Sequence, residues 1–345
     1  MTPAPGRKWR DPDYRATQGK GGNFGGIFFG VLLNHYVKQR IVDLFECAQG
    51  TDAPCSSCYF GVLSTAISRD SRSVFLYTKP FLKWAGGKYR ILDKILRELP
   101  AGARFVEPFA GSCAVYLNAD FPVALVCDLN SDLINLYRHI QQEGEDFIQY
   151  CATFFTPENN TRSGYMALRD RLNTSSDTRE RGALLLYVNR HAFNGLIRYN
   201  SKGGFNVPFG KYKKPYFPLK ELRAFYSKTR STVTEFVATD FRSVFTRLKL
   251  GDVVYCDPPY VPLSQTASFT AYAGNAFHAQ DQNDLATCAK EAWQKGIHIV
   301  LSNHDTEITR KLYSAAMLKR FAVQRFISCD SDNRGVAPEL LAVYG

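Results

Sequence analysis

The residues Asp257-Pro258-Pro259-Tyr260 combine groups that could hold a planar aromatic amine. They directly follow the apolar run 253–256, which we expect to be a strand. Two prolines cannot continue a central strand, so they predict a rigid turn at its carboxyl end. There the Asp257 carboxylate and a backbone carbonyl of the turn would accept the two N–H groups of a nucleobase amine, while the Tyr260 ring stacks on the base. The pattern predicts positioning catalysis on an extruded base, without a covalent enzyme intermediate.

A second group of candidate residues follows the expected strand 104–107, in the turn Glu107-Pro108-Phe109-Ala110-Gly111-Ser112. A glycine in such a turn lets the backbone approach a ligand closely. Asp128 follows the next expected strand, where nucleotide-binding α/β folds hold ribose hydroxyls with an acidic side chain. An ordinary strand–turn–helix connection is the alternative. Neither G-x-G-x-x-G nor G-x-x-x-x-G-K-[ST] occurs, which argues against a dinucleotide oxidoreductase and a P-loop NTPase.

A third group lies in Phe81-Leu82-Lys83-Trp84-Ala85-Gly86-Gly87-Lys88, just before an expected helix. Trp84 would pack against a flat cofactor, and Lys88 would reach a carboxylate on it. A helix entry with a buried tryptophan explains these residues equally well when they are taken alone.

The positive charge of the chain gathers in one stretch. The formal net charge is +11, and residues 190–230 carry ten basic side chains and one acidic side chain. The overlapping segment 189–217 interleaves basic and amide side chains with aromatic ones. Arg198 or Asn194 would read base edges, and Phe193 would insert beside a base step. A solvated basic loop is the alternative, but the density of the mixture favours contact with nucleic acid.

The elements that must position these groups alternate between strands and helices, which predicts an α/β fold with a mainly parallel sheet. The expected strands are 104–107, 123–127, 252–256, 297–301, 321–328 and 340–344, the last two forming an antiparallel edge. The expected helices are 91–96, 165–172, 181–190, 281–294 and 305–316, with another capped by Asn130 or Ser131.

The segment 146–235 interrupts this alternation, and we interpret it as an inserted domain. The catalytic domain would then comprise 79–145 and 236–345. Residues 1–78 read differently, with a glycine-rich run, and form an extension of unknown role that is either flexible or weakly ordered.

Composition excludes several classes of protein. No apolar run approaches the roughly 18–20 residues that a membrane span needs, and the charged start does not resemble a signal peptide. We therefore expect a cytoplasmic protein without a membrane partner. Nine cysteines are scattered along the chain, so we expect them to be reduced and mostly buried. No spacing indicates a metal site.

Eight segments, in this order, resemble motifs of the Dam family of DNA adenine-N6 methyltransferases (the alpha class). The segments are FLKWAGGK, EPFAGS, VCDLNSDLINLY, NRHAFNGLIRYN, FNVPFGKYKKPYF, VVYCDPPYVPLS, FTAY and LSNHDT. The resemblance covers about residues 80–344. It implies a Rossmann-like methyltransferase with a mixed seven-stranded sheet and an inserted, mainly helical target-recognition domain. It also implies S-adenosylmethionine as methyl donor, double-stranded GATC as target, base flipping of the adenine, and a monomer.

The resemblance also assigns residues, position by position. Catalysis would rest on Asp257, Pro258, Pro259 and Tyr260. The cofactor would be bound by Trp84, Gly86, Gly87, Lys88, Glu107, Phe109, Gly111, Asp128, Asp240, Phe241 and Asp257. DNA would be bound by Lys83, Arg190, Phe193, Asn194, Leu196, Arg198, Asn200, Pro208, Lys211, Tyr212 and Lys213.

The chain departs from the family pattern at four places. Cys113 stands where a second glycine is usual, Phe193 where Tyr is common, and Lys211 where Arg is common. The loop around Arg334 has one basic residue where several are often found. The change at Cys113 bears on cofactor affinity, Phe193 lacks the tyrosine hydroxyl, and Lys211 lacks the bidentate contact of an arginine.

Other functions remain open at this point. The same chemistry could act on cytosine N4, on RNA adenine or on a protein amide, although the basic insertion argues against protein. A catalytically idle DNA-binding regulator is the alternative from another class, and the intact DPPY and cofactor turn argue against it.

Overall fold

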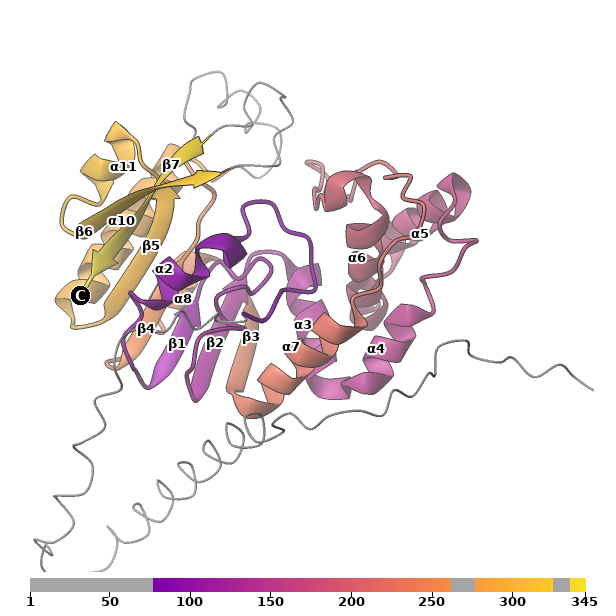
Figure 1. Cartoon of the computed structure of the whole chain (residues 1–345), viewed down its shortest axis with the longest axis horizontal. Helices are drawn as coiled ribbons and strands as arrows, with labels where there is room; N and C mark the ends of the chain where they lie inside the picture. Colours follow the sequence, from indigo (N-terminus) through magenta and orange to yellow (C-terminus); the bar gives the residue numbers. More distant parts are fainter. Residues whose placement is uncertain (1–76, 262–276, 325–335) are drawn as a thin grey trace, which may run out of the picture. The chain divides into compact units, whose positions relative to one another are not determined.

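The computed structural model describes residues 77–261, 277–324 and 336–345, which belong to one compact unit, Val74–Gly345 (Figure 1). The predicted extension 1–78 lies almost entirely outside the described residues. The FTAY segment, 269–272, and Arg334 also lie outside them. No helix in the described parts of the chain is both long and apolar enough to cross a membrane.

A seven-stranded sheet organises the described residues. Its strands are β1 (Arg104–Glu107), β2 (Val123–Asp128), β3 (Val233–Ala238), β4 (Asp252–Cys256), β5 (His298–His304), β6 (Met317–Gln324) and β7 (Val336–Tyr344). They lie in the order β3-β2-β1-β4-β5-β7-β6. Strands β1 to β5 pair in parallel, and β7 runs antiparallel between β5 and β6. The predicted α/β class, the mixed sheet and its antiparallel edge are confirmed.

The chain order of the strands reverses between β1 and β4. From β1 the chain proceeds outward to β2 and β3, and after β4 it proceeds to β5 on the other side. In open α/β sheets, ligands bind beyond the carboxyl ends of the strands at such a switch point. The turns that follow Glu107 and Cys256 both lie there.

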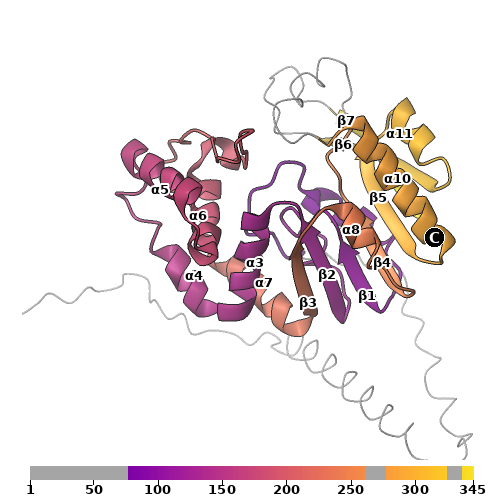
Figure 2. The ribbon, with the colours of Figure 1, turned by 180° about the vertical axis from the view of Figure 1, so that it is seen from behind.

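Helices cover both faces of the sheet. The helices of the described residues are η1 (Lys88–Ile91), α2 (Leu92–Leu96), α3 (Ser131–Glu143), α4 (Glu145–Ala152), α5 (Arg162–Thr174), α6 (Thr178–His191), η2 (Phe193–Gly195), α7 (Leu219–Ser231), α8 (Phe241–Phe245), α10 (Ala279–Gln294) and α11 (Glu307–Leu312), of which α4, α5, α6 and η2 pack on other helices rather than on the sheet. Strand alternation explains the two faces: Phe105 belongs to the core shared with α2, α3 and α7, whereas Val106 belongs to the core shared with α8 and α10. Figure 2 shows α8 and α10 in front of the sheet when the molecule is viewed from behind.

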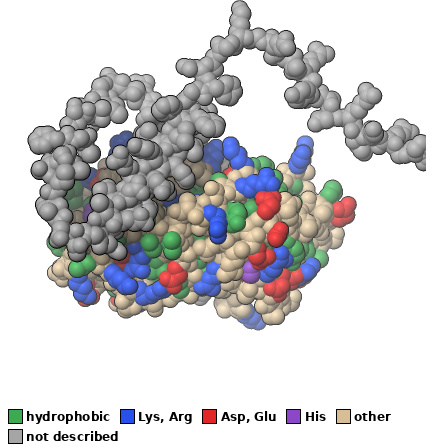
Figure 3. All heavy atoms as spheres, turned by 90° about the horizontal axis from the view of Figure 1, so that it is seen from below, with side chains coloured by type: hydrophobic (Ala, Val, Ile, Leu, Met, Phe, Trp, Pro, Cys, Tyr) green, Lys and Arg blue, Asp and Glu red, His purple; other side chains and the backbone are tan. Residues whose placement is uncertain are grey.

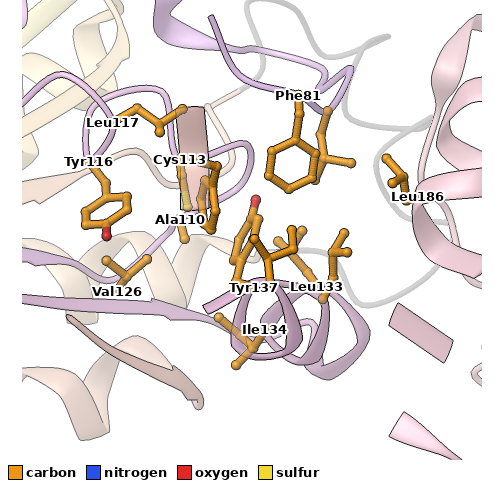
Figure 4. Close-up of a cluster of buried hydrophobic side chains, with 14 of the residues drawn as sticks. Phe81, Ala110, Cys113, Tyr116, Leu117, Val126, Leu133, Ile134, Tyr137 and Leu186 are labelled. Atoms are coloured by element: carbon orange, nitrogen blue, oxygen red, sulfur yellow. The ribbon is translucent and has the colours of Figure 1, made fainter. Parts of the chain in front are cut away.

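The core on the α3 face also supports the turn after β1. Figure 4 shows Tyr137 of α3 beside Phe81, with its hydroxyl toward the loop that carries Ala110 and Cys113. That hydroxyl donates a hydrogen bond to the Gly111 carbonyl. The start of α3 is capped by Asn130, whose side chain accepts a bond from Leu133 N, as predicted.

Several expected boundaries were wrong. Strand β5 runs on to His304 rather than ending at 301, and helix α11 is shorter than the expected 305–316. Strand β6 begins at Met317, four residues before 321, because an edge strand with mostly exposed side chains lacks an apolar run to mark its start. Strand β3 was not predicted, for the same reason: it forms the other edge, and only Phe236 in it is buried.

Candidate active site

One cavity of about 990 Å³ lies at the carboxyl ends of the parallel strands. Loops after β1, β2, β3 and β4 line it, together with the segment before η1. Every predicted catalytic and cofactor residue lines this cavity: Trp84, Gly86, Gly87, Lys88, Glu107, Phe109, Gly111, Asp128, Asp240, Phe241, Asp257, Pro258, Pro259 and Tyr260. The structure therefore brings these residues together, although their individual roles stay predictions.

Asp257 makes two close polar contacts in this cavity. The Lys88 ammonium lies 2.8 Å from its Oδ1, and the Ser302 hydroxyl donates to the same oxygen at 2.8 Å. Lys88 is buried, and its Nζ also lies 4.6 Å from the centroid of the Tyr260 ring. In this structure Lys88 pairs with Asp257. The predicted contact of Lys88 with a cofactor carboxylate stays a prediction.

Residues of β5 and α10 hold the DPPY turn in place through hydrogen bonds. The Gln282 side chain donates to the Pro259 carbonyl at 2.7 Å, and Val261 N donates to Asn303 Oδ1 at 3.0 Å. The His304 ring lies 2.6 Å from the Val261 carbonyl through Nδ1. These contacts hold the turn rigid and leave the side chains of Asp257 and Tyr260 facing the cavity.

The turn after β1 depends on a glycine. Gly111 has φ +45°, and a Cβ there would lie 2.7 Å from the indole nitrogen of Trp84. Its N–H donates to Asp128 Oδ2 at 3.0 Å, while Asn130 N donates to Asp128 Oδ1 at 2.9 Å. The left-handed φ and the close approach of Trp84 thus explain why this position is glycine. Cys113 is also left-handed, at φ +59°, which fits the glycine usual there in the resembling family.

Two carboxyl groups of the cavity have raised pKa values. Burial raises the pKa of Glu107 well above its ordinary value, against the opposing effect of the hydrogen bond from Tyr116 N; the charges of Asp257 and Asp128 raise it further. Burial also raises the pKa of Asp128, against the opposing bonds from the Asn130 and Gly111 amides. Perturbed carboxyl groups in a cleft are typical of functional sites.

Three aromatic rings form one wall of the cavity. Ring centroids of Phe109 and Phe241 lie 5.5 Å apart, and Phe277 lies 5.7 Å from Phe109 and 5.6 Å from Phe241. Such a wall suits a flat heterocyclic ligand. Asp240 caps α8 beside it, where it accepts a bond from Arg242 N.

The predicted DNA-binding residues lie outside the cavity, and all except Lys83, which precedes η1, and Arg190, in the last turn of α6, lie on loops after α6. Two backbone bonds hold these loops side by side: Phe193 N donates to the Pro208 carbonyl and Gly210 N to the His191 carbonyl, both at 2.8 Å. Seven of the predicted residues are exposed: Phe193, Asn194, Arg198, Asn200, Pro208, Lys211 and Lys213. Leu196, Tyr212 and Lys83 are half-buried, and Lys83 Nζ lies 4.4 Å from the centroid of the Tyr212 ring.

Arg190 occupies a different environment. Its side chain is buried at the end of α6, donates to the Phe81 carbonyl and lies 5.5 Å from the centroid of the Tyr216 ring. In this structure Arg190 joins α6 to the loop before Trp84, and its predicted contact with DNA remains a prediction.

Some residues that support the site were not assigned a role from the sequence. Ser302, Asn303 and Gln282 support the DPPY turn, and the buried Asn189 binds the backbone of Lys83 and Gly195. Their partners lie far away along the chain, so spacing alone does not reveal the contacts. For Ser302, Asn303 and Asn189 the only indication is their position inside the motif segments LSNHDT and NRHAFNGLIRYN, and Gln282 lies outside every motif segment.

Comparisons with known proteins agree with this site. The model for D12 class N6 adenine-specific DNA methyltransferases matches residues 84–327. A DNA adenine methylase of Vibrio cholerae is 47% identical over 267 residues, which cover 77% of this chain and 96% of the relative. The DNA adenine methylases of Serratia marcescens and Escherichia coli K12 are 46% and 45% identical, over 98% and 95% of their own lengths.

Proposed function

The chain belongs to the D12 class of N6 adenine-specific DNA methyltransferases, and from this membership we propose that it methylates adenine N6 within double-stranded GATC. S-adenosylmethionine would be the methyl donor, and the target adenine would flip out of the duplex. The observation that carries the proposal is the meeting of the DPPY turn and the turn after β1 in one cavity. We further propose that the enzyme acts as a cytoplasmic monomer.

The residues of the cavity fit S-adenosylmethionine. The aromatic wall of Phe109, Phe241 and Phe277 suits its adenine ring, and Asp128 suits its ribose. Six carboxyl groups and two basic side chains line the cavity; Asp257 pairs with Lys88, and Asp240 and Asp281 pair with Arg242. When bound, this cofactor supplies an electrophilic methyl carbon. The volume of about 990 Å³ lies at the upper end of the roughly 300–1,000 Å³ usual for ligand pockets and supports a base beside the cofactor.

The chain's own groups would position the adenine amine. The Asp257 carboxylate would accept one N6–H, and a carbonyl of the Pro-Pro turn would accept the other. The Pro259 carbonyl already accepts a bond from Gln282, whereas no described residue donates to the Pro258 carbonyl. We therefore assign the second acceptor to Pro258. Both bonds draw the nitrogen lone pair away from the ring, and the Tyr260 ring would stack on the base.

We propose that 146–235 is the target-recognition domain. The paired loops after α6 project on the side of the molecule toward which the parallel strands point (Figures 1 and 2). They carry the exposed basic, amide and aromatic side chains that read bases and hold phosphates. Arg198 is the strongest candidate for base reading, because Asn206 Oδ1 holds its Nε at 2.8 Å and orients the guanidinium.

The test is methyl transfer from S-adenosylmethionine carrying a labelled methyl group. We expect label on duplexes that contain GATC and little on duplexes with one base of GATC changed. Equal labelling of both would contradict the specificity. Nucleoside analysis of the product should give N6-methyladenine, whereas N4-methylcytosine, or labelling of RNA alone, would replace the proposed substrate. A chain that binds DNA but not the cofactor would be an idle regulator.

A further inference from the structure

The two carboxylate oxygens of Asp257 have unequal environments. Lys88 Nζ and Ser302 Oγ both contact Oδ1 at 2.8 Å. Among residues 77–261, 277–324 and 336–345, none donates a hydrogen bond to Oδ2. One oxygen is therefore held by the protein, while the other remains available to a ligand in the cavity.

The direction of the hydrogen bonds follows from the protons available. Ser302 Oγ lies 2.8 Å from Asp257 Oδ1 and 3.4 Å from the Cys256 carbonyl, so its single hydroxyl proton points at the nearer acceptor, the carboxylate, which when ionised only accepts. The Tyr255 hydroxyl lies 3.0 Å from Ser302 Oγ and must then donate to it. Burial raises the pKa of Tyr255 well above its ordinary value, so that hydroxyl keeps its proton. The result is a chain of two donors, Tyr255 to Ser302 to Asp257.

The sheet places these three groups. The parallel register of β4 and β5 pairs Cys256 with Leu301, and one further step along both strands sets Asp257 beside Ser302. Tyr255 and Ser302 have no exposed surface, so neither hydroxyl competes with solvent. Two neighbouring central strands form a rigid support, and a catalytic group gains accuracy when such a support holds it.

From this geometry we infer that Ser302 is a positioning residue for methyl transfer, which it serves by holding Oδ1 of Asp257 so that Oδ2 meets the target amine. Tyr255 orients the Ser302 hydroxyl for that task. The inference rests on the proposed function, because it needs an amine at Oδ2. Without Ser302, the carboxylate would be held only by Lys88, a flexible side chain, and would turn away from the productive orientation.

The experiment compares Ser302→Ala with the wild type in steady-state methylation of a GATC duplex. A misplaced reacting group costs rate but not binding, so we expect kcat to fall on the order of 10- to 100-fold. KM for the duplex and Kd for S-adenosylmethionine should stay within about twofold of the wild type. A duplex with 2-aminopurine in place of the target adenine should brighten equally with both proteins, because flipping precedes the lost contact. Ser302→Thr keeps the hydroxyl and should recover most of kcat.

Unchanged kcat in Ser302→Ala would overturn the inference, as would a parallel loss of kcat, cofactor binding and 2-aminopurine signal. If Ser302→Ala does not fold, Tyr255→Phe takes its place and should lower kcat by a smaller factor. Its matched control is Tyr187→Phe, which removes a buried hydroxyl bonded to the Asn159 carbonyl and should leave kcat unchanged. Equal kcat values for Tyr255→Phe and the wild type would remove Tyr255 from the arrangement.

A structural measurement that does not depend on enzymatic activity separates this inference from the proposed function. In crystal structures, the Asp257 carboxylate of Ser302→Ala should be rotated relative to the wild type. An unmoved carboxylate would overturn the inference even in an active enzyme. A wild type that does not methylate adenine would instead contradict the proposed function, while the rotation would still report on the role of Ser302.

Discussion

At the scale of single residues, Asp257 concentrates the charge and hydrogen bonding of the site. Its carboxylate pairs with the buried Lys88 and accepts a hydrogen bond from Ser302. The Lys88 ammonium also lies over the ring of Tyr260 in the same turn. Ion pairs of this kind lose more when one partner is removed than they contribute when intact, because the other charge stays buried. A substitution at Asp257 must therefore be judged by chemistry and by stability separately.

We expect Asp257→Ala to reduce methyl transfer by about 10²–10⁴-fold, since it removes an acceptor for the reacting amine. DNA affinity should change little, because the paired loops after α6 that carry the predicted DNA-binding residues, here called the recognition loops, lie outside the cavity. Single-turnover transfer and a DNA-binding titration measure the two effects. Asp120→Ala removes an exposed carboxylate and serves as the control. Wild-type turnover in Asp257→Ala would exclude Asp257 from the mechanism.

Glu107 links the cavity to pH. Burial holds the pKa of Glu107 well above the ordinary value in the folded protein, whereas in the unfolded chain the pKa of this carboxyl group is about 4.3. Between these two pKa values the folded state binds more protons than the unfolded state. The free energy of unfolding therefore decreases as the pH rises through this window and levels off above the folded pKa.

Glu107→Gln should consequently raise the thermal unfolding midpoint at pH 8 more than at pH 5. The amide keeps an acceptor for Tyr116 N but carries no charge to bury. Melting curves at the two pH values, with Glu235→Gln on the exposed edge strand as the control, test this expectation. An equal shift at both pH values would mean that ionisation of Glu107 does not limit stability.

At the scale of elements, two asparagine side chains clamp the ends of the segment 78–83. Asn118 accepts from Thr78 N and donates to the Thr78 carbonyl, at 2.8 and 3.0 Å. Asn189 of α6 makes the same pair of bonds with Lys83, at 2.9 and 2.8 Å, and a further one with the Gly195 carbonyl. Only the second clamp joins the cavity wall to the recognition loops.

Asn189→Ala should lower the free energy of unfolding by about 1–3 kcal/mol, because it leaves buried backbone groups without partners. It should also weaken DNA binding, since Gly195 and its neighbours lose their support. Asn118→Ala is the matched control: a comparable loss of stability with unchanged DNA affinity is expected. Urea unfolding and DNA titration of both variants measure the two effects. Equal DNA affinities of Asn189→Ala and Asn118→Ala would show that the Asn189 clamp does not support DNA recognition.

The elements also show how far sequence reasoning reaches. Strands β1 and β4 match their predicted bounds, because a proline follows each short run within two residues, Pro108 after β1 and Pro258 after β4. The exposed edge strand β3 escaped prediction, since edge strands lack a continuous apolar signature. Motif positions predicted which residues line the cavity, including those on five separate loops.

Contacts between distant side chains were not predictable. The bond from Gln282 to the Pro259 carbonyl and the pairing of Lys88 with Asp257 depend on tertiary packing, which no spacing rule encodes. The burial of Arg190 is a similar case, because a basic residue in a basic stretch is expected to face solvent.

At the scale of the whole compact unit, charge is distributed unevenly. The loops of 193–217 lie on the side toward which the parallel strands point, whereas α7, which carries four of the ten basic side chains of 190–230, runs toward the opposite side. On the opposite side, shown in Figure 3, basic and acidic side chains of the described residues are intermixed. A concentrated basic surface beside the cavity would attract the DNA backbone and present the recognition loops to the duplex.

The electrostatic share of DNA binding can be separated from base reading. Lys213 and Lys214 are exposed and adjacent, so the double substitution to Ala should reduce the slope of log K against log salt by about 2 and weaken all duplexes alike. Arg198→Ala should instead reduce the preference for GATC over a changed site by about 1–3 kcal/mol. Titrations at several salt concentrations, with both duplexes and both variants, measure slope and preference independently. If the lysine pair altered the preference for GATC and Arg198 altered only the salt slope, Lys213 and Lys214 would be the base-reading residues and Arg198 a phosphate contact.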